Sequence, residues 1–259
     1  MSRADQEPRE PQPQHPDDPV PPVIALAWGQ RGRGARGPKP GLTIARIAQA
    51  GIDLASRDGI EAVSMARVAS ELGAGTMSLY RHIASKDDLL TLMVDTALGL
   101  PDIPDEIGRA GWRAGLEWWA RNVLQAYNRH PWGLKVPITA PPLGPNNVAW
   151  MEAALEAMAD TPLSEPEKLA TLLLISGFVR NAATLSADIA AASNAATPTH
   201  SYGEILSELT DRTHFPAVHR AIDSGTFDDD DPDDFDATFD YGLERILDGI
   251  EALINREQR

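Results

Sequence analysis

From residue 43 onward, apolar residues recur at every third or fourth position, which is the spacing of one face of an α-helix. The first segment of this kind runs from residue 43 to residue 58, and its apolar side chains are Ile44, Ile47, Ala48, Ile52 and Ala55. Asp58 and Gly59 then form a typical turn signal, where a helix ends. We therefore predict a first helix that directs one apolar face at a core.

Three helices are predicted directly after the first, and the first two of these are short. Ser64 is a good N-cap residue for the second helix, and the glycines of the segment 73–75 mark the turn that follows it. Residues 76–82 are predicted to form the third helix. Ser85, with Asp88 three residues later, resembles a capping box and begins a fourth helix that ends before residue 101.

Beyond residue 104 the predicted helices become longer. They cover residues 108–129, 146–160, 165–192, 201–211 and 216–224, and a final helix has an apolar stripe from Phe235 to Ile254. The acidic run 228–234 lacks the Gly-centred spacing of a calcium loop and is interpreted as a solvated loop. Because no segment alternates as a strand does, the sequence predicts an all-α protein.

The second and third helices have the arrangement of a helix-turn-helix. Two short helices joined by a glycine-containing turn and braced by the first helix make a three-helix DNA-binding unit. The later helix of such a pair must be fixed on one side and exposed on the other. Leu79 and Ile83 are expected to face inward, which leaves these side chains outward or at the rim: Thr76, Met77, Ser78, Tyr80, Arg81 and His82.

Two stretches carry a more specific signal than this general pattern. Residues 64–73 read SMARVASELG and residues 79–90 read LYRHIASKDDLL. Over residues 42–100 the chain closely resembles the TetR family of transcriptional repressors. Many members have tyrosine at the position of His82, and the histidine there resembles the tetracycline-repressor branch most. The resemblance implies a three-helix DNA-binding domain followed by a larger helical domain for ligand binding and dimerisation. It also implies a repressor without enzymatic activity, whose partners are an operator in double-stranded DNA, a small-molecule effector and a second copy of the chain.

The resemblance assigns DNA contacts to nine positions. They are Ser64, Arg67, Thr76, Met77, Ser78, Tyr80, Arg81, His82 and Lys86. Thr76, Met77, Ser78 and Arg81 would lie against base edges or nearby backbone, whereas Ser64, Tyr80, His82 and Lys86 would reach phosphates or sugars. The alternative for each is plain solvent-exposed surface. Ala66 stands where some family members carry a base-reading arginine, and Gly75 and Met77 are also atypical, so the operator sequence is not readable from these residues.

The net charge of −15 is unusual for a DNA-binding protein, but the charge is unevenly distributed. Residues 30–90 carry nine basic and six acidic residues, whereas residues 91–259 carry 12 basic and 27 acidic ones. An acidic body with one basic end would be repelled from DNA everywhere except at that end. The alternative is that the acidic surface only keeps the protein soluble.

The N-terminal segment has a different composition from the rest. Residues 1–29 are rich in proline and are predicted to be disordered, and residues 31–39 form a basic segment that is either a DNA-contacting arm or a solvated linker. We therefore expect an N-terminal arm at 1–40, the DNA-binding domain at 41–86 and the second domain at 87–259. No signal-peptide pattern is present, and no apolar run approaches the roughly 18 residues of a membrane span, so we expect a cytoplasmic protein without membrane contact.

Four of the six tryptophans fall within residues 112–132, where a ligand site is one interpretation and an aromatic core is the other. The candidate ligand-binding residues are Trp112, Trp119, Tyr127, His130, Trp132, Phe178 and Asn181. Trp118 and Trp119 cannot both face one way on a helix. No cofactor and no metal are expected. The tetracycline-repressor branch binds a magnesium chelate through a histidine near the position of His130, and this resemblance is the single indication of a metal. The chain has no cysteine, which excludes disulfides and thiolate zinc sites.

Two helices have more apolar surface than one chain requires, the segment 165–192 and the final helix. Two copies of each would form a four-helix dimer interface with twofold symmetry, and the expected operator is therefore an inverted repeat. Two alternatives are an architectural DNA binder without an effector and a helical small-molecule-binding protein. Catalysis has no candidate residues, because the sequence lacks a glycine-rich phosphate loop, a His-Glu-x-x-His motif and a nucleophile elbow.

Overall fold

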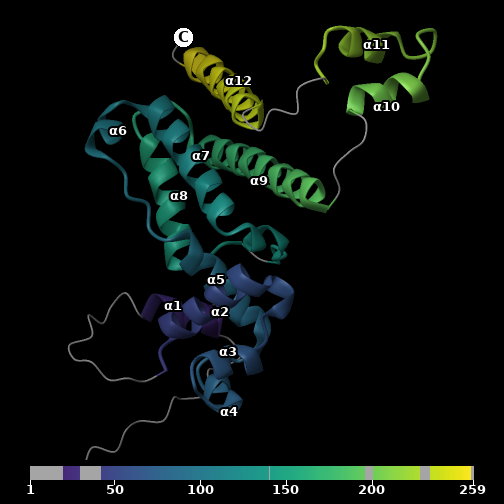
Figure 1. Cartoon of the computed structure of the whole chain (residues 1–259). Coiled ribbons are helices and arrows are strands. Elements are labelled where there is room, and N and C mark those ends of the chain that lie inside the picture. The colour runs from purple at the N-terminus through teal and green to yellow at the C-terminus, as the bar shows by residue number, and fades with distance from the viewer. Residues whose placement is uncertain (1–19, 30–41, 140, 196–200, 228–233, 258–259) are drawn as a thin grey trace, which may run out of the picture. The chain divides into compact units, whose positions relative to one another are not determined.

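A computed structural model of the chain describes residues 20–29, 42–139, 141–195, 201–227 and 234–257 (Figure 1). These residues contain helices and no strand, so the prediction of an all-α protein is confirmed. The α-helices are α1 (Pro22–Gly29), α2 (Ile44–Asp58), α3 (Met65–Glu71), α4 (Thr76–Tyr80), α5 (Lys86–Leu98), α6 (Asp105–Arg109), α7 (Trp112–Arg129), α8 (Pro145–Ala157), α9 (Glu165–Ala195), α10 (Tyr202–Leu209), α11 (Pro216–Asp223) and α12 (Asp234–Glu257). Two 3-10 turns, η1 (Ile60–Ala62) and η2 (Pro131–Lys135), complete the described elements.

The helix boundaries follow the capping residues of the sequence. The Thr43 hydroxyl accepts a hydrogen bond from the Arg46 backbone N–H at 3.2 Å and begins α2. Ser64 and Ser85 cap α3 and α5 in the same way, at 3.3 and 3.0 Å. Gly59 ends α2 with a φ of 84°, which a side chain would strain. The helices predicted from residue 43 to residue 98 are therefore present with nearly the predicted bounds.

One expectation about the N-terminal segment is wrong. Residues 22–29, predicted as part of a disordered arm, form helix α1. Val23, Ile24 and Ala27 are buried, and the Trp28 indole N–H donates to the Leu143 carbonyl oxygen at 2.9 Å. The prediction of disorder rested on the proline content of the whole segment, whereas residues 22–29 form a short apolar run that packs against α5. The basic segment 31–39 lies outside the described residues.

The described chain divides into two compact units. The first comprises Met1–Leu100 and Val136–Ala149, and the second comprises Pro101–Lys135 and Trp150–Arg259. The first unit therefore extends past the boundary expected at residue 86 and includes all of α5. That helix packs along α2, where Gly51 leaves room for the Met93 side chain. The predicted helix-turn-helix and α5 therefore share one core.

The second unit is built around α7, α9 and α12. Helix α9 packs against both other helices, and Ile175, Val179 and Leu243 lie in the core between them. Phe178 stacks on Phe239 with the ring centroids 5.2 Å apart. At the surface of this unit, ion pairs join α7 to α12, including Arg121–Asp240 at 2.6 Å.

Helix α9 corrects an expectation about apolar runs. By length and composition its segment Glu165–Ala192 could span a membrane, with a mean hydropathy of 1.4, whereas the sequence was expected to hold no such run. The core helix of a soluble protein passes the same test, and α9 packs on α7 and α12. Its other face exposes apolar side chains of these residues: Leu169, Leu173, Leu174, Leu185 and Ile189.

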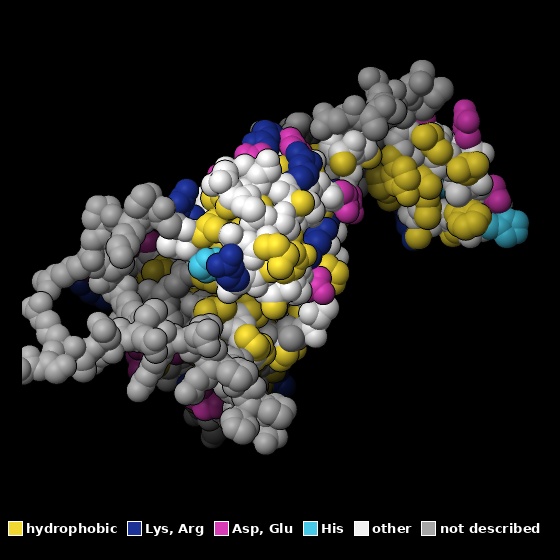
Figure 2. All heavy atoms as spheres, turned by 90° about the horizontal axis from the view of Figure 1, so that it is seen from below, with side chains coloured by type: hydrophobic (Ala, Val, Ile, Leu, Met, Phe, Trp, Pro, Cys, Tyr) yellow, Lys and Arg dark blue, Asp and Glu magenta, His cyan; other side chains and the backbone are white. Residues whose placement is uncertain are grey.

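Helices α10 and α11 form a small hairpin. The Arg212 guanidinium pairs with both oxygens of Asp223, at 2.6 and 2.7 Å, and the buried His219 ring contacts Thr210. Apolar side chains gather on the outside of this hairpin, at the right of Figure 2; Tyr202, Leu209 and Phe215 are among the exposed ones. The acidic run that follows, residues 228–233, lies outside the described part of the chain.

Candidate functional site

The segment from Ser64 to Ile83 folds as a helix-turn-helix. The inner faces of α3 and α4 bury Val68, Ala69 and Leu79. Gly73 has a φ of 63°, and the Ala74 backbone N–H donates to the Ala69 carbonyl oxygen, so the turn is closed by a left-handed glycine after α3. This geometry fixes α4 on one side, as the sequence predicts.

The other side of α4 is exposed. The Met77 side chain is 74% exposed and that of Tyr80 is 46% exposed, although both are large and partly or wholly apolar. Arg81 is exposed beside them, and Thr76, Ser78 and His82 are partly exposed. Lys86 is exposed at the first position of α5. The structure therefore brings the predicted DNA-contacting residues of α4 together with Lys86 in one compact unit.

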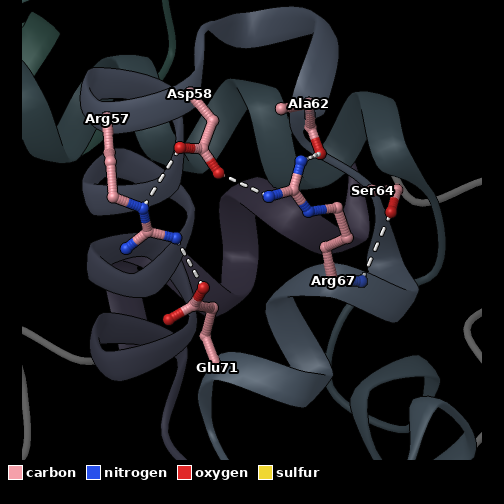
Figure 3. A network of polar contacts seen from close by, with 6 residues as sticks. All are labelled: Arg57, Asp58, Ala62, Ser64, Arg67 and Glu71. Atoms are coloured by element: carbon pink, nitrogen blue, oxygen red, sulfur yellow. Dashed lines mark hydrogen bonds and ion pairs between the residues drawn. The ribbon is translucent and has the colours of Figure 1, made fainter.

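Arg67 lies in a different environment from the other candidates. Figure 3 shows that its guanidinium pairs with the Asp58 carboxylate and approaches the Ala62 carbonyl oxygen. Arg57 pairs with the same Asp58 at 3.2 Å and with Glu71 at 2.6 Å. These contacts tie the end of α2 to α3 and brace the helix-turn-helix. DNA contact by Arg67 remains a prediction, and it would require the ion pair with Asp58 to open.

The central carboxylate of this network makes the motif sensitive to acid. Burial acts to raise the pKa of Asp58, but hydrogen bonds from Arg57 and Arg67 and their charges outweigh it, so the pKa is lowered below its ordinary value of 3.8. A lowered pKa means that the folded state holds the charged form more strongly than the unfolded state does. The stabilisation is complete above the ordinary pKa and is lost as the pH falls toward the lowered one.

We therefore expect Asp58→Asn to lower the thermal midpoint at neutral pH, and the gap to wild type to close as the pH falls below about 4. Thermal unfolding followed by circular dichroism between pH 7 and pH 3 measures the gap. Glu61→Gln, a change of one exposed acid on the neighbouring η1, is the matched control and should show no such closing. A gap for Asp58→Asn that stays constant with pH would contradict the role of the charge.

The predicted aromatic residues fall into more than one group. In the first group, the Trp119 indole N–H donates to the Trp150 carbonyl oxygen at 2.8 Å, and Trp118 stacks on Trp150 at 5.5 Å. Trp119 is buried and Trp118 is partly exposed, and both rings contact Trp150, Trp118 stacked on it and Trp119 edge-on. Trp150, on α8, was not predicted, because it lies outside the tryptophan-rich stretch.

The second group, which we call the His130 cluster, consists of Tyr127, His130, Trp132 and Arg180. His130 and Trp132 lie with their rings 5.9 Å apart, and the His130 Nδ1 atom is buried without a hydrogen-bond partner. Burial lowers the pKa of His130, and the charge of Arg129 adds to this effect, so the neutral form of the ring is favoured. The Arg180 guanidinium lies 5.8 Å from the Tyr127 ring centroid and donates to the Leu134 carbonyl oxygen at 2.9 Å.

The His130 cluster consists of two contacting pairs, His130 with Trp132 and Arg180 with Tyr127, and the Arg180 guanidinium also bonds to the backbone of η2, the turn that holds Trp132. A site of this composition is able to hold an aromatic molecule that carries polar substituents. Arg180 was not among the ligand-binding residues predicted from the sequence. Its position as the one arginine within the apolar sequence of α9 could have indicated it.

Three other predicted ligand residues lie apart from both groups. Phe178 packs against Phe239 and Gly242 of α12, Asn181 is exposed on α9, and Trp112 is partly exposed at the start of α7. Their ligand contacts remain predictions. In the described parts of the chain, no group of three or more His, Asp or Glu side chains is arranged to hold a metal ion.

Two protein-family profiles match the chain. The profile "Bacterial regulatory proteins, tetR family" matches residues 47–93, and "Tetracyclin repressor-like, C-terminal domain" matches residues 103–254. The first covers the helix-turn-helix, and the second covers the helices that follow it. The two domains expected from the sequence resemblance are therefore both recognised.

Individual proteins are similar over most of the chain. An HTH-type transcriptional repressor of Streptomyces coeruleorubidus, DrrR1, is 38% identical over 243 residues, which are 90% of this chain and 86% of the relative. An HTH-type transcriptional regulator of Saccharopolyspora erythraea is 29% identical and covers 85% of this chain and 89% of its own. The crystal structure of the Streptomyces coelicolor TetR family protein ActR in complex with actinorhodin has a TM-score of 0.68 at 27% identity, covering 82% of this chain and 98% of its own. The ActR complex with (S)-DNPA has a TM-score of 0.67 at 27% identity, covering 83% and 99%.

Proposed function

The chain belongs to the TetR family of bacterial regulatory proteins, and from this premise we propose that it is a homodimeric repressor that binds an inverted-repeat operator and is released from it by a small-molecule effector. As a member of this family it is a DNA-binding regulator and not an enzyme. The observation that carries the proposal is the exposed face of α4, where Met77 and Tyr80 stand in solvent beside Arg81. Exposed large side chains of this kind fit a surface that is covered by a partner.

Sequence recognition is proposed to come from α4. A recognition helix enters the major groove and reads base edges, while neighbouring residues fix its position through phosphates. We assign Thr76, Met77, Ser78 and Arg81 to the first task, and Ser64, Tyr80, His82 and Lys86 to the second. Regulation of this kind takes place on DNA in the cytoplasm.

The effector is proposed to be an aromatic small molecule that binds at the His130 cluster. ActR was crystallised with actinorhodin and with (S)-DNPA, and its similarity covers 82% and 83% of this chain in the two complexes. The buried Nδ1 atom of His130 without a partner supports this location, because a buried polar atom is stabilised by a hydrogen bond. Actinorhodin is accordingly the first probe to use.

The dimer is proposed to form through α9. Its exposed leucines and Ile189 would be covered by the same residues of a second copy, which is the arrangement of a twofold interface. The apolar stripe of α12, in contrast, is mostly buried within its own chain. Its buried residues include Phe239, Leu243 and Leu247. Two recognition helices would then lie about 34–36 Å apart, one turn of DNA.

The proposal is tested by selecting fragments of the source genome that the protein binds. We expect the bound fragments to share an inverted repeat and actinorhodin to release them. We also expect actinorhodin to quench the tryptophan fluorescence, because Trp132 lies in the His130 cluster. Trp132→Phe should remove part of this quenching, whereas Trp28→Phe, a matched change on α1 of the first unit, should leave it unchanged.

Two outcomes would contradict parts of this proposal. Bound fragments without a repeated half-site would contradict the twofold operator. Operator binding that no compound in a broad screen of aromatic molecules weakens would favour the architectural DNA binder without an effector.

A further inference from the structure

A buried carboxylate holds α5 and α8 together in the first unit. This carboxylate belongs to Asp95 on α5, a residue that is only 5% exposed. Its oxygens accept hydrogen bonds from the backbone N–H groups of Asn146 and Asn147, at 3.1 and 2.9 Å, and from the Asn147 side-chain amide at 2.8 Å. The Asn146 side chain in turn donates to the Asp95 carbonyl oxygen at 2.9 Å. We call these three residues, with Gly144, the α5–α8 joint.

The joint replaces an ordinary helix cap. Helix α8 begins at Pro145, so Gly144 stands at the capping position, where Ser, Thr, Asp or Asn normally supplies the oxygen. Asp95 supplies it instead, from 51 residues earlier in the chain. A side chain at Gly144 would collide with the Asp95 carboxylate, so the glycine permits the close approach. The start of α8 is thereby fixed to α5 in one orientation, since several hydrogen bonds to one carboxylate must be satisfied together.

A second tie holds the segment just before α8. The Trp28 indole N–H donates to the carbonyl oxygen of Leu143, and the buried residues of α1 dock this helix on the same unit, next to α5. Three segments distant in the sequence therefore meet at the start of α8. None of these contacts lies within the helix-turn-helix itself, which has its own caps and core.

The two ends of α8 belong to different units. Its first residues lie in the unit that contains the DNA-binding motif, and from Trp150 onward it belongs to the second unit. There Trp150 stacks on Trp118 and accepts the hydrogen bond from Trp119. Helix α5, at the other side of the joint, packs along α2, which braces α3. A movement of α8 that keeps the joint closed must therefore move α5.

We propose that Asp95 is a positioning residue that couples α8 to the DNA-binding unit, so that effector and operator influence each other through this carboxylate. The proposal rests on the function proposed above. Coupling between two binding sites is reciprocal, so if an effector changes operator affinity by way of α8, operator binding must in turn change the stability of the arrangement of α8 that the effector favours. This reciprocity allows a test with DNA alone, before any effector is identified.

The test compares hydrogen exchange of the full chain with and without a selected operator fragment. In wild type we expect the DNA to slow exchange in residues 64–86 and, through the joint, to slow the amides of residues 146–148 by about fivefold or more. In Asp95→Asn, one acceptor oxygen becomes an N–H₂ group that faces other donors. Residues 64–86 should still be slowed by DNA, whereas the effect at 146–148 should fall below about twofold.

Asp53→Asn is the matched control, because it makes the same change of charge at an exposed position of the same unit. It should retain the wild-type response at residues 146–148. If Asp95→Asn does not fold, the double variant Asn146→Ala, Asn147→Ala removes both side-chain hydrogen bonds and leaves the carboxylate; its response at 146–148 should be less than half that of wild type.

The outcomes separate this proposal from the one it rests on. Equal DNA-induced slowing at residues 146–148 in wild type and in the joint variants would overturn the role of Asp95 and leave the repressor function standing. Absence of slowing at residues 64–86 in wild type would overturn DNA binding by the helix-turn-helix, and the coupling with it.

Discussion

Lys86→Ala is expected to weaken operator binding by about 100-fold, because a dimer loses two contacts to charged phosphates at about 1.5 kcal/mol each. The side chain is exposed at the start of α5, so its removal leaves the core intact. The loss should be equal on operator and on unrelated DNA, because a phosphate contact carries no sequence information. The slope of log affinity against log salt should fall by about 2, since two phosphates per dimer are no longer neutralised.

Tyr80→Ala provides a sharp comparison. Its hydroxyl is expected to donate to a phosphate without carrying charge, so affinity should fall while the salt slope stays near that of wild type. Lys135→Ala removes an exposed positive charge from the second unit and is the matched control for Lys86→Ala. Fluorescence anisotropy of a labelled operator at several salt concentrations gives both quantities. Wild-type affinity in both Tyr80→Ala and Lys86→Ala would refute the assignment of α4 and the start of α5 to DNA.

The helix-turn-helix was predictable from the sequence because its determinants are local. Ser64 and Ser85 cap helices within three residues of themselves, and Gly73 takes a left-handed turn conformation that glycine adopts without strain. The inward position of Leu79 follows from helical spacing alone. Local patterns of this kind need no knowledge of the rest of the fold, and the family profile that matches residues 47–93 confirms the assignment.

The joint at Asp95 and the docking of α1 were not predictable in this way. Asp95 lies in a helix whose pattern gives no reason to bury a carboxylate, and its partners are 51 residues away. The Trp28–Leu143 hydrogen bond spans 115 residues. Contacts of such long range depend on how the helices pack, which periodicity within one helix does not determine.

The aromatic residues show an intermediate case. Their concentration between residues 112 and 132 indicated where aromatic contacts would form, and the structure has two groups there. Which tryptophan is buried depends on the neighbouring helices, as the pair Trp118 and Trp119 demonstrates. Phe178 stacks on Phe239 of α12, a packing that helical spacing alone does not determine, and its ligand contact remains a prediction.

Leu173→Glu is expected to convert the proposed dimer into a monomer and thereby to abolish repression. The Leu173 side chain is 74% exposed in a single chain, so glutamate there costs the protomer little. In a twofold interface through α9 the same change would bury two carboxylates among leucines, which is strongly unfavourable unless each finds a partner. Sedimentation should then show a species of 28.0 kDa instead of twice that mass.

The loss of the dimer should carry over to DNA because, in the proposed function, the operator is read by two heads held together. Once the first head is bound, the second finds its half-site at a high effective concentration, and separating the heads removes this gain, at least about 100-fold in affinity. Ile138→Glu makes a comparable change at an exposed position of the first unit, 71% exposed, and should leave both dimer and affinity unchanged. A Leu173→Glu variant that remains dimeric would place the interface elsewhere than on the exposed face of α9. If instead the variant is monomeric but binds the operator as tightly as wild type, a single head suffices and the inverted repeat is not required for recognition.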